Sequence, residues 1–378
     1  GLARELGVAG RGERRRALVS NADVLQPAAL LLQAQGVGQA QIGVPDHAED
    51  LPDAPVGHGF HQEIAHGSDV WRLPRKSDVD PVLAFIDGKG LDAIVEAANA
   101  RGIKVMFSVV AAPAWARGGK SGVGPPDNYQ DFYNFMGALA AHYKGRVHAY
   151  EIWNEQNLQR EWEGAPLSAA HYVRLLSGAY RAIKAADPNA IVVSGAPTPT
   201  GINDGSWAID DRTYLQQMYA AGLKNVCDAV GAHPSGYANP PDVRYTGGDF
   251  DPGRGYDDHP SFFFRNTMED YYQIMAANGD GGKRVWATEF GWPTTSGMGV
   301  GPSPGYEFSE DINEQQQADY IVRAYQWSRN WGHAGVMFLW NLNFWPTTGP
   351  ENEMAKYGIV RGDWGPRPAY IALKNMPK

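Results

Sequence analysis

The chain has little of several features that commonly indicate a function. Cys227 is its single cysteine, which excludes an intrachain disulfide and a cysteine-based zinc site. No apolar run is long enough to span a membrane as a helix. A net charge of -9 argues against a nucleic-acid partner, because phosphate binding requires a basic face. These absences argue against a nucleic-acid-binding protein and against a membrane-spanning helix.

Signals for nucleotide binding and for export are also missing. No G-x-G-x-x-G or Walker pattern opens a helix, which lowers the weight of a nucleotide-binding reading. Basic residues at Arg14, Arg15 and Arg16 are not followed by a compact apolar segment with a small-residue cleavage site, so no signal peptide is visible. The compartment is left open by these residues.

Aromatic residues are scarce at the start of the chain and abundant after it. The chain has 12 Trp, 18 Tyr and 13 Phe, yet only Phe60, Trp71 and Phe85 lie in its first hundred positions. In an acidic chain, aromatic surfaces suit sugar rings, whose C–H faces stack on indole and phenol. Large proteins also bury aromatics in their cores, and for a single residue both readings remain open. At 43% hydrophobic, the chain has enough apolar residues for a full core.

Strand and helix patterns alternate through most of the chain. Near-continuous apolar runs, typical of parallel strands covered on both faces, are followed by segments with helical spacing. The expected strands are 103–110, 146–153, 191–195, 226–232, 284–289 and 335–340. The expected helices are 91–100, 129–143, 168–186, 211–221, 261–277, 311–330 and 368–373. Strict alternation of this kind predicts a parallel α/β sheet.

The connections favour a closed barrel over an open doubly wound sheet. The long polar loops, such as 118–126, 235–260 and 294–305, follow strands, whereas the helix-to-strand connections are short. One functional face at the strand ends is typical of a (β/α)8 TIM barrel. We therefore expect a single domain over residues 1–378, with two strand–helix units drawn from residues 1–90.

Residues 1–90 are atypical in composition for a barrel. They are rich in Ala, Gly, Gln and Arg and have few β-branched runs. The spacing predicts a helix over 28–35, whereas the strand candidates at 36–44 and 65–73 are weak. The first two strand–helix units are therefore poorly supported by sequence.

Two glutamates follow apolar strands. Glu155 ends the strand that contains Tyr150, and Glu289 ends the strand before Gly291. Paired carboxylates at strand ends are the groups that glycoside hydrolysis requires. Glu151 faces the same side as Glu155 but lies deeper, and we interpret it as a buried, paired structural carboxylate.

Four local motifs carry a family resemblance. They are Pro113-Ala114-Trp115-Ala116, Trp153-Asn154-Glu155-Gln156-Asn157, His233-Pro234-Ser235-Gly236-Tyr237 and Glu289-Phe290-Gly291-Trp292. Over about residues 77–378 the chain resembles the retaining β-glycosidases of clan A, most similar to the xylosidase-like family 39, with the cellulase-like family 5 next. The resemblance implies a hydrolase of β-linked oligo- or polysaccharides with an extracellular or cell-envelope location.

The resemblance also implies roles for individual residues. Glu155 would be the acid/base on barrel strand four, and Glu289 the nucleophile on strand seven. Asn154 would donate to the sugar 2-hydroxyl, and His233 and Tyr237 would position the nucleophile and the sugar. Aromatic residues beyond the strand ends would form the sugar platform and the subsite walls; these are Trp340 for the platform and Trp115, Trp292, Phe344 and Trp345 for the walls.

A histidine cluster does not fit a metal site. His58, His61 and His66 do not follow the H-E-x-x-H order, and His61 and His66 would not share one helical face. We expect no metal and no cofactor. Two other readings remain, a catalytically inactive barrel that binds glycans and a metal-dependent barrel hydrolase. The sequence does not show whether a glycan would be cut internally or at its end, and it does not show the oligomeric state.

Overall fold

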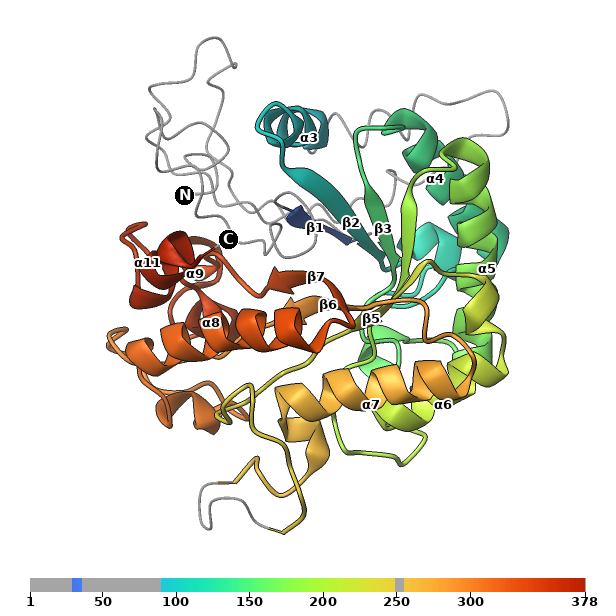
Figure 1. The fold of residues 1–378 in the computed structure, drawn as a ribbon. Coiled ribbons are helices and arrows are strands. Elements are labelled where there is room, and N and C mark those ends of the chain that lie inside the picture. Colours follow the sequence, from blue (N-terminus) through green and yellow to red (C-terminus); the bar gives the residue numbers. More distant parts are fainter. Residues whose placement is uncertain (1–28, 36–89, 249–254, 378) are drawn as a thin grey trace.

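The structure is a parallel sheet with helices around it (Figure 1). It is a computed structural model that describes residues 29–35, 90–248 and 255–377, and of 29–35 the backbone alone. Its seven strands are hydrogen-bonded in chain order. They are β1 Ala29–Gln35, β2 Lys104–Val110, β3 Ala149–Ile152, β4 Ile191–Ser194, β5 Ala229–Ala232, β6 Val285–Phe290 and β7 Ala334–Leu339. Since β1 also contacts β7, the sheet curls round so that its two edge strands approach each other.

The helices lie outside the sheet (Figure 1). The α-helices are α3 Leu91–Asn99, α4 Tyr129–His142, α5 Ala169–Ala186, α6 Asp211–Ala220, α7 Phe264–Ala277, α8 Glu314–Trp331, α9 Trp345–Thr348, α10 Glu353–Tyr357 and α11 Pro368–Asn375. Short 3-10 helices are η3 Ala114–Arg117, η4 Gln159–Glu161, η5 Leu223–Asn225, η6 Pro260–Phe262 and η7 Glu307–Glu310. Four long helices begin after a polar residue whose side chain accepts a backbone N–H, as N-caps do; these are Asn128, Ser168, Asp210 and Asn313.

Two apolar clusters show that the sheet encloses an interior. The larger cluster lies between the strands and the helices. The smaller one is made only of strand residues, with one buried side chain from each of six successive strands; these are Met106, Ala149, Val193, Ala229, Trp286 and Phe338. In an open doubly wound sheet helices would cover both faces, whereas a barrel interior is filled by strand side chains alone. The fold is therefore a (β/α)8 barrel, of which the described residues supply seven strands.

The structure confirms the expected strands from 103 onward and the helices between them, with shifted boundaries. The helix expected over 28–35 is wrong, because Ala29–Gln35 is the strand β1. Ala, Leu and Gln favour helices locally, but this segment pairs in parallel with β2, from Ala29 beside Lys104 to Gln35 beside Val110. Tertiary pairing thus overrides a weak local preference. The strand candidates at 36–44 and 65–73, and the His58, His61 and His66 cluster, lie outside the described residues.

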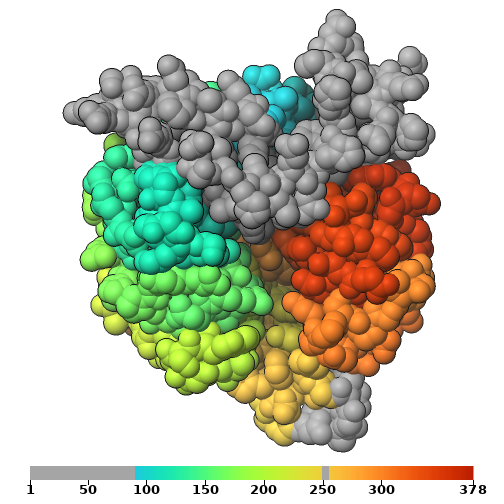
Figure 2. Space-filling view, turned by 180° about the vertical axis from the view of Figure 1, so that it is seen from behind, coloured from blue at the N-terminus to red at the C-terminus, as the bar shows by residue number. Residues whose placement is uncertain are grey.

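The surface of the barrel and the hydropathy of its helices complete the description of the fold. Figure 2 shows a face that is hollowed between the green and the orange-red parts of the chain. Among the helices that the structure describes, none is long and apolar enough to cross a membrane.

Candidate active site

A sharp backbone turn at the end of β3 presents Glu155. The backbones of Trp153 (φ 77°) and Glu155 (φ 47°) both lie in the left-handed region, which residues other than glycine rarely adopt. Backbone bonds to the two neighbouring strand ends hold the turn, from Trp153 N to Val109 O (2.9 Å) and from Glu155 N to Ala196 O (3.0 Å). Strained backbone of this kind persists where the surroundings over-determine it, and it gathers at functional sites.

A glycine lets the next strand pass close to this turn. A Cβ at Gly195 would lie 2.5 Å from the backbone oxygen of Ile152 and 2.7 Å from that of Trp153. The Tyr172 hydroxyl joins the same two strands, since it donates to Ile152 O (2.8 Å) and accepts from Gly195 N (2.6 Å). The position of Glu155 therefore depends on close backbone packing between β3 and β4.

His233 lies between the two glutamates. Its Nδ1 is 3.2 Å from Glu155 Oε1 and its Nε2 is 3.9 Å from Glu289 Oε1. All three side chains are largely buried, with 6% of His233, 16% of Glu155 and 17% of Glu289 exposed. They come from the ends of β5, β3 and β6. The structure thus brings together the three residues at the centre of the expected site.

The charges of these groups are strongly coupled. Burial acts to raise the pKa of Glu155, but the hydrogen bond and charge of His233 and the charge of Arg160 lower it to about 2. Burial acts to lower the pKa of His233, but the carboxylates of Glu289 and Glu155 raise it to about 9. At neutral pH the proton of the His233–Glu155 pair therefore resides mainly on the imidazole.

Glu151 lies fully buried below the site, as expected. Burial raises its pKa, against the charge of the nearby His233. The expectation that it is a paired carboxylate is not met, since among the described residues neither of its oxygens has a hydrogen-bond partner and His233 is the charge that acts on it. A buried carboxyl group without a cation partner is held more readily as the neutral acid.

Asn154 and Trp340 lie beside the glutamates. Asn154 precedes Glu155, and its Oδ1 is buried without a hydrogen-bond partner among the described residues. Trp340 follows β7, donates its backbone N–H to Phe290 O (2.8 Å), and lies 5.0 Å from Phe344 between ring centroids. Its indole is partly exposed. An unmet polar atom and a partly exposed ring are groups that a bound sugar can engage.

The Tyr237 side chain contacts the loop after β4. Its hydroxyl donates to Pro199 O (3.4 Å), in the segment after β4. Its ring stacks on Tyr256 and packs against Phe308. Burial raises its pKa, helped by the nearby Tyr306 and Glu155. The structure therefore shows Tyr237 supporting the loop beside Glu155.

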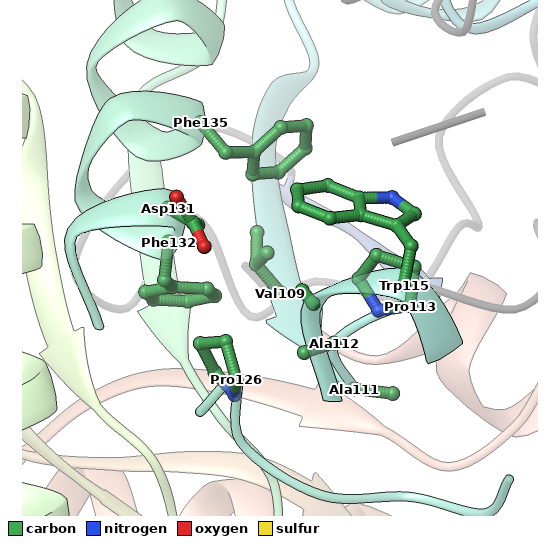
Figure 3. A pocket seen from close by; sticks show the side chains of 10 residues that line it. Val109, Ala111, Ala112, Pro113, Trp115, Pro126, Asp131, Phe132 and Phe135 are labelled. Atoms are coloured by element: carbon green, nitrogen blue, oxygen red, sulfur yellow. The ribbon is translucent and has the colours of Figure 1, made fainter. Parts of the chain in front are cut away.

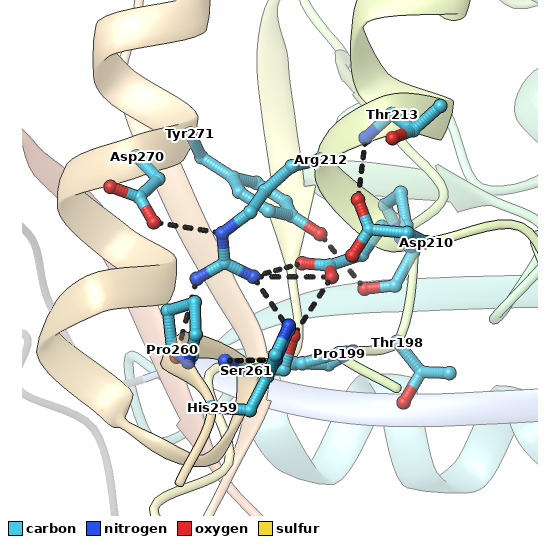
Figure 4. A network of polar contacts seen from close by, with 12 residues as sticks. Thr198, Pro199, Asp210, Arg212, Thr213, His259, Pro260, Ser261, Asp270 and Tyr271 are labelled. Carbon is cyan, nitrogen blue, oxygen red and sulfur yellow. Dashed lines mark hydrogen bonds and ion pairs between the residues drawn. The ribbon is translucent and has the colours of Figure 1, made fainter. Parts of the chain in front are cut away.

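A polar network joins the loops after β4 and β5 (Figure 4). Arg212, in the first turn of α6, donates from Nε to Asp270 Oδ2 (2.7 Å) and from Nη2 to Pro260 O (3.3 Å). Tyr271 of α7 donates to Pro197 O (3.2 Å). Burial raises the pKa of Asp211 to about 6, with Arg212 opposing the rise. The network holds the loop that contributes Ala196 to the turn at Glu155.

The outer tryptophans are placed differently. Trp292 is fully buried, packs against Phe264 and donates to Asn239 O (2.9 Å), so the expectation that it walls a subsite is wrong. Trp292 follows a strand end, but its indole is packed in the larger apolar cluster. Trp345, at the start of α9, is partly exposed and packs on Gly362.

Trp115 lies in an apolar pocket of its own. Figure 3 shows its indole and the ring of Phe135 facing the same hollow, which Val109 also lines. The lining residues of this pocket include neither glutamate and not His233. The structure thus groups Trp115 with the β2–α4 side of the barrel.

Sequence reasoning missed Arg160. Its Nη2 lies 3.3 Å from Glu155 Oε2, and its Nε lies 3.5 Å from Glu161 Oε1. Burial first, and the charge of Glu155 next, raise the pKa of Glu161 to about 7. Tyr306 was also missed; its pKa is raised by burial and by the charges of Glu353 and Glu155. No local pattern distinguishes these residues from other polar loop residues.

No metal site accompanies the glutamates in the part of the chain that the structure describes. No group of three or more His, Cys, Asp or Glu side chains there is arranged to hold an ion. The absence of metal and cofactor stays an expectation.

Comparison with known proteins identifies the family. The family model for cellulase (glycosyl hydrolase family 5) matches residues 87–341, more than half of the chain. The chain belongs to this family. The resemblance to clan A is confirmed, with family 5 as the matched model where the motifs placed family 39 first.

Individual relatives are also similar to this chain. A β-xylosidase of Geobacillus stearothermophilus is 27% identical over 169 residues, which are 40% of this chain and 32% of the relative. A family 39 glycoside hydrolase of Bacteroides cellulosilyticus WH2 matches with TM-score 0.55 and 23% identity over 76% of this chain and 52% of that chain. A glucosidase of Croceicoccus marinus matches with TM-score 0.50 and 13% identity over 75% of this chain and 52% of that chain. This chain thus spans about a third to a half of these proteins, and the two structures support the barrel fold.

Proposed function

We propose that this protein is a retaining β-glycoside hydrolase that acts by double displacement. The observation that carries the proposal is the imidazole of His233 placed between two strand-end carboxylates, 3.2 Å from Glu155 and 3.9 Å from Glu289. Because the His233 ring approaches both Glu155 and Glu289, the two carboxylates belong to one site and could act on the same glycosidic bond. Retention requires close carboxyl groups, about 5–5.5 Å apart.

In the first step Glu289 attacks the anomeric carbon. A covalent glycosyl–enzyme ester forms, the bond to the leaving-group oxygen breaks, and Glu155 gives a proton to that oxygen. Because the pKa of Glu155 is low and that of His233 high, this proton reaches Glu155 from His233 along their 3.2 Å hydrogen bond. His233 thus supplies the proton that the resting carboxylate lacks.

In the second step Glu155 acts as a base. It takes a proton from water, whose oxygen attacks the anomeric carbon and displaces Glu289 as a carboxylate. Esterification removes the charge of Glu289, which is the largest influence raising the pKa of His233. His233 therefore holds a proton less tightly in the intermediate and regains it when Glu289 is released.

Substrate contacts follow from the surrounding residues. Asn154, with its unmet buried oxygen, would bind a sugar hydroxyl, and the partly exposed Trp340 would stack on the sugar ring that is cleaved. Membership of the cellulase family and similarity to a β-xylosidase both support a β-linked oligo- or polysaccharide substrate.

A screen of aryl β-glycosides and β-linked polysaccharides, with the product anomer followed by NMR, tests the proposal. We expect hydrolysis with retention, and a loss of at least about a thousandfold in kcat for Glu289→Gln. Glu155→Gln should lower activity most on substrates with poor leaving groups, because these need a proton from the acid to depart. Glu96→Gln, an exposed carboxylate on α3, is the matched control and should retain activity.

Three results would contradict the proposal. An inverted product would exclude double displacement. Glycan binding without hydrolysis by the wild type would instead indicate the catalytically inactive barrel, and loss of activity with a chelator would indicate metal-dependent hydrolysis.

A further inference from the structure

Arg160 lies at the outer side of Glu155. Its guanidinium approaches Oε2 of Glu155, whereas His233 approaches Oε1. The Arg160 side chain is 60% exposed, so this side of Glu155 faces solvent. Since Glu155 would protonate the departing oxygen, a group at its solvent side is placed to meet the leaving part of the substrate.

The guanidinium of Arg160 is incompletely engaged. Its two carboxylate contacts are 3.3 Å to Glu155 and 3.5 Å to Glu161. Charge-assisted N–H···O bonds are usually about 2.7–2.9 Å long. Its Nη1 has no hydrogen bond to any residue that the structure describes. A guanidinium with spare N–H groups suits a ligand carboxylate, which it can bind through two parallel bonds.

An exposed tryptophan lies on the segment that pairs with the segment before this arginine. Trp207, in the loop between β4 and α6, is 57% exposed. Its backbone oxygen accepts from the N–H of Gln159, the residue before Arg160, at 2.9 Å. The neighbouring pair Leu158 and Ala208 forms an antiparallel bridge. The two segments are therefore held side by side.

The loop that carries Trp207 is well braced. The Asp204 carboxylate accepts N–H bonds from Ser206 (2.9 Å), Trp207 (2.7 Å) and Ala208 (3.1 Å). Because hydrogen bonds hold this loop, the Trp207 indole stays exposed to solvent. Its apolar face is uncovered, and a sugar ring could stack on it. Beside a site for glycosides, a sugar ring is the occupant that this surface fits.

We propose that Arg160 and Trp207 form the leaving-group subsite, and that it takes a sugar bearing a carboxylate, a uronic acid. The inference rests on the proposed glycosidase function. The indole stacks on the ring of the leaving sugar, and the guanidinium binds its carboxylate. A carboxylate that draws Arg160 from Glu155 also removes a cation that opposes protonation of Glu155, so the acidic leaving group assists its own departure.

Two β-linked disaccharides test this inference. They share the glycone preferred in the aryl glycoside screen and differ only at C-6 of the leaving sugar, which is a carboxylate in one and a hydroxymethyl group in the other. We expect kcat/KM of the wild type to favour the carboxylate by at least about tenfold, the size of one hydrogen bond to a charged group. Added salt should reduce this preference.

Variants separate the two residues. Arg160→Gln should bring the ratio of the two kcat/KM values to about one. Trp207→Ala should lower both values by a similar factor, with Trp207→Phe close to wild type. The control Arg181→Gln alters an exposed arginine on α5 that bonds only to Ser177 among the described residues, and should keep the preference.

The outcomes are distinct. Equal hydrolysis of both disaccharides by the wild type, or a preference that survives in Arg160→Gln, overturns the acidic subsite and leaves the proposed function standing. Failure of the wild type to hydrolyse any β-glycoside overturns the proposed function, and the subsite with it.

Discussion

The Nδ1 atom of His233 lies 3.2 Å from Oε1 of Glu155, although the two residues come from barrel strands that are not adjacent. The contact joins the end of β3 to the end of β5, across β4. It places a cation against one carboxylate while the other ring nitrogen turns toward Glu289. The protonation of all three groups is therefore linked, and a change at His233 should affect both glutamates.

We expect His233→Gln to lower kcat by about a hundredfold, the usual scale of one proton-transfer group. The variant should also change the pH profile, because it removes the group with a pKa of about 9 that holds the proton for Glu155. Steady-state kinetics over pH measure both effects. His171→Gln, on the outer helix α5, is the control, and a profile unchanged in His233→Gln would contradict the role given to the imidazole.

Stability should depend on pH through the same pair. The folded pKa of His233 rises from 6.5 to about 9, so its stabilisation is complete below 6.5 and is lost as pH rises through about 9. The folded pKa of Glu155 falls from 4.5 to about 2, so its stabilisation is complete above 4.5 and is lost as pH falls through about 2. Urea unfolding of the wild type and His233→Gln over this range tests the prediction, and an alkaline decline of equal size in both proteins would refute it.

Gly195→Ala should disturb the turn that presents Glu155. The new Cβ would lie 2.5 Å from Ile152 O and 2.6 Å from Gln156 Oε1, so β3 and β4 must separate. We expect a loss of about 1–3 kcal/mol in unfolding free energy, as in other overpacked sites, and a fall in kcat. Chemical denaturation and kinetics measure the two. A Cβ at Gly282 meets no atom within 4 Å, so Gly282→Ala should be tolerated.

Arg367→Met should destabilise the loop after β6. The buried guanidinium of Arg367 bonds to Glu314 Oε1 (2.9 Å), Gly358 O (2.8 Å) and Ser296 O (3.0 Å). Its removal leaves Glu314 with Arg361 as its remaining cation and takes the donor from two carbonyls, and we expect a cost of about 1–3 kcal/mol. Arg329→Met, at an exposed position on α8, should change stability by much less. Equal unfolding midpoints for the two variants would contradict this account.

Several features were determined by the sequence alone. Apolar runs and helical spacing predicted the strands and helices from residue 103 onward, because these patterns record which side of each element is buried. The same runs placed Glu155 and Glu289 at the mouth of the barrel, since the carboxyl ends of parallel strands meet at one face. Glu151, deeper in its strand, was correctly expected to be buried.

Other features were decided only by the tertiary structure. The segment Ala29–Gln35 has helix-forming residues but becomes a strand by pairing with β2. Trp292 follows a strand end yet is buried, whereas Trp207 and Arg160, in ordinary loop sequence, are exposed on two segments that pair through their backbones. Local sequence reports backbone preference and burial along one element. Which side chains from distant loops meet depends on strand pairing and loop packing, and these are set by the whole chain.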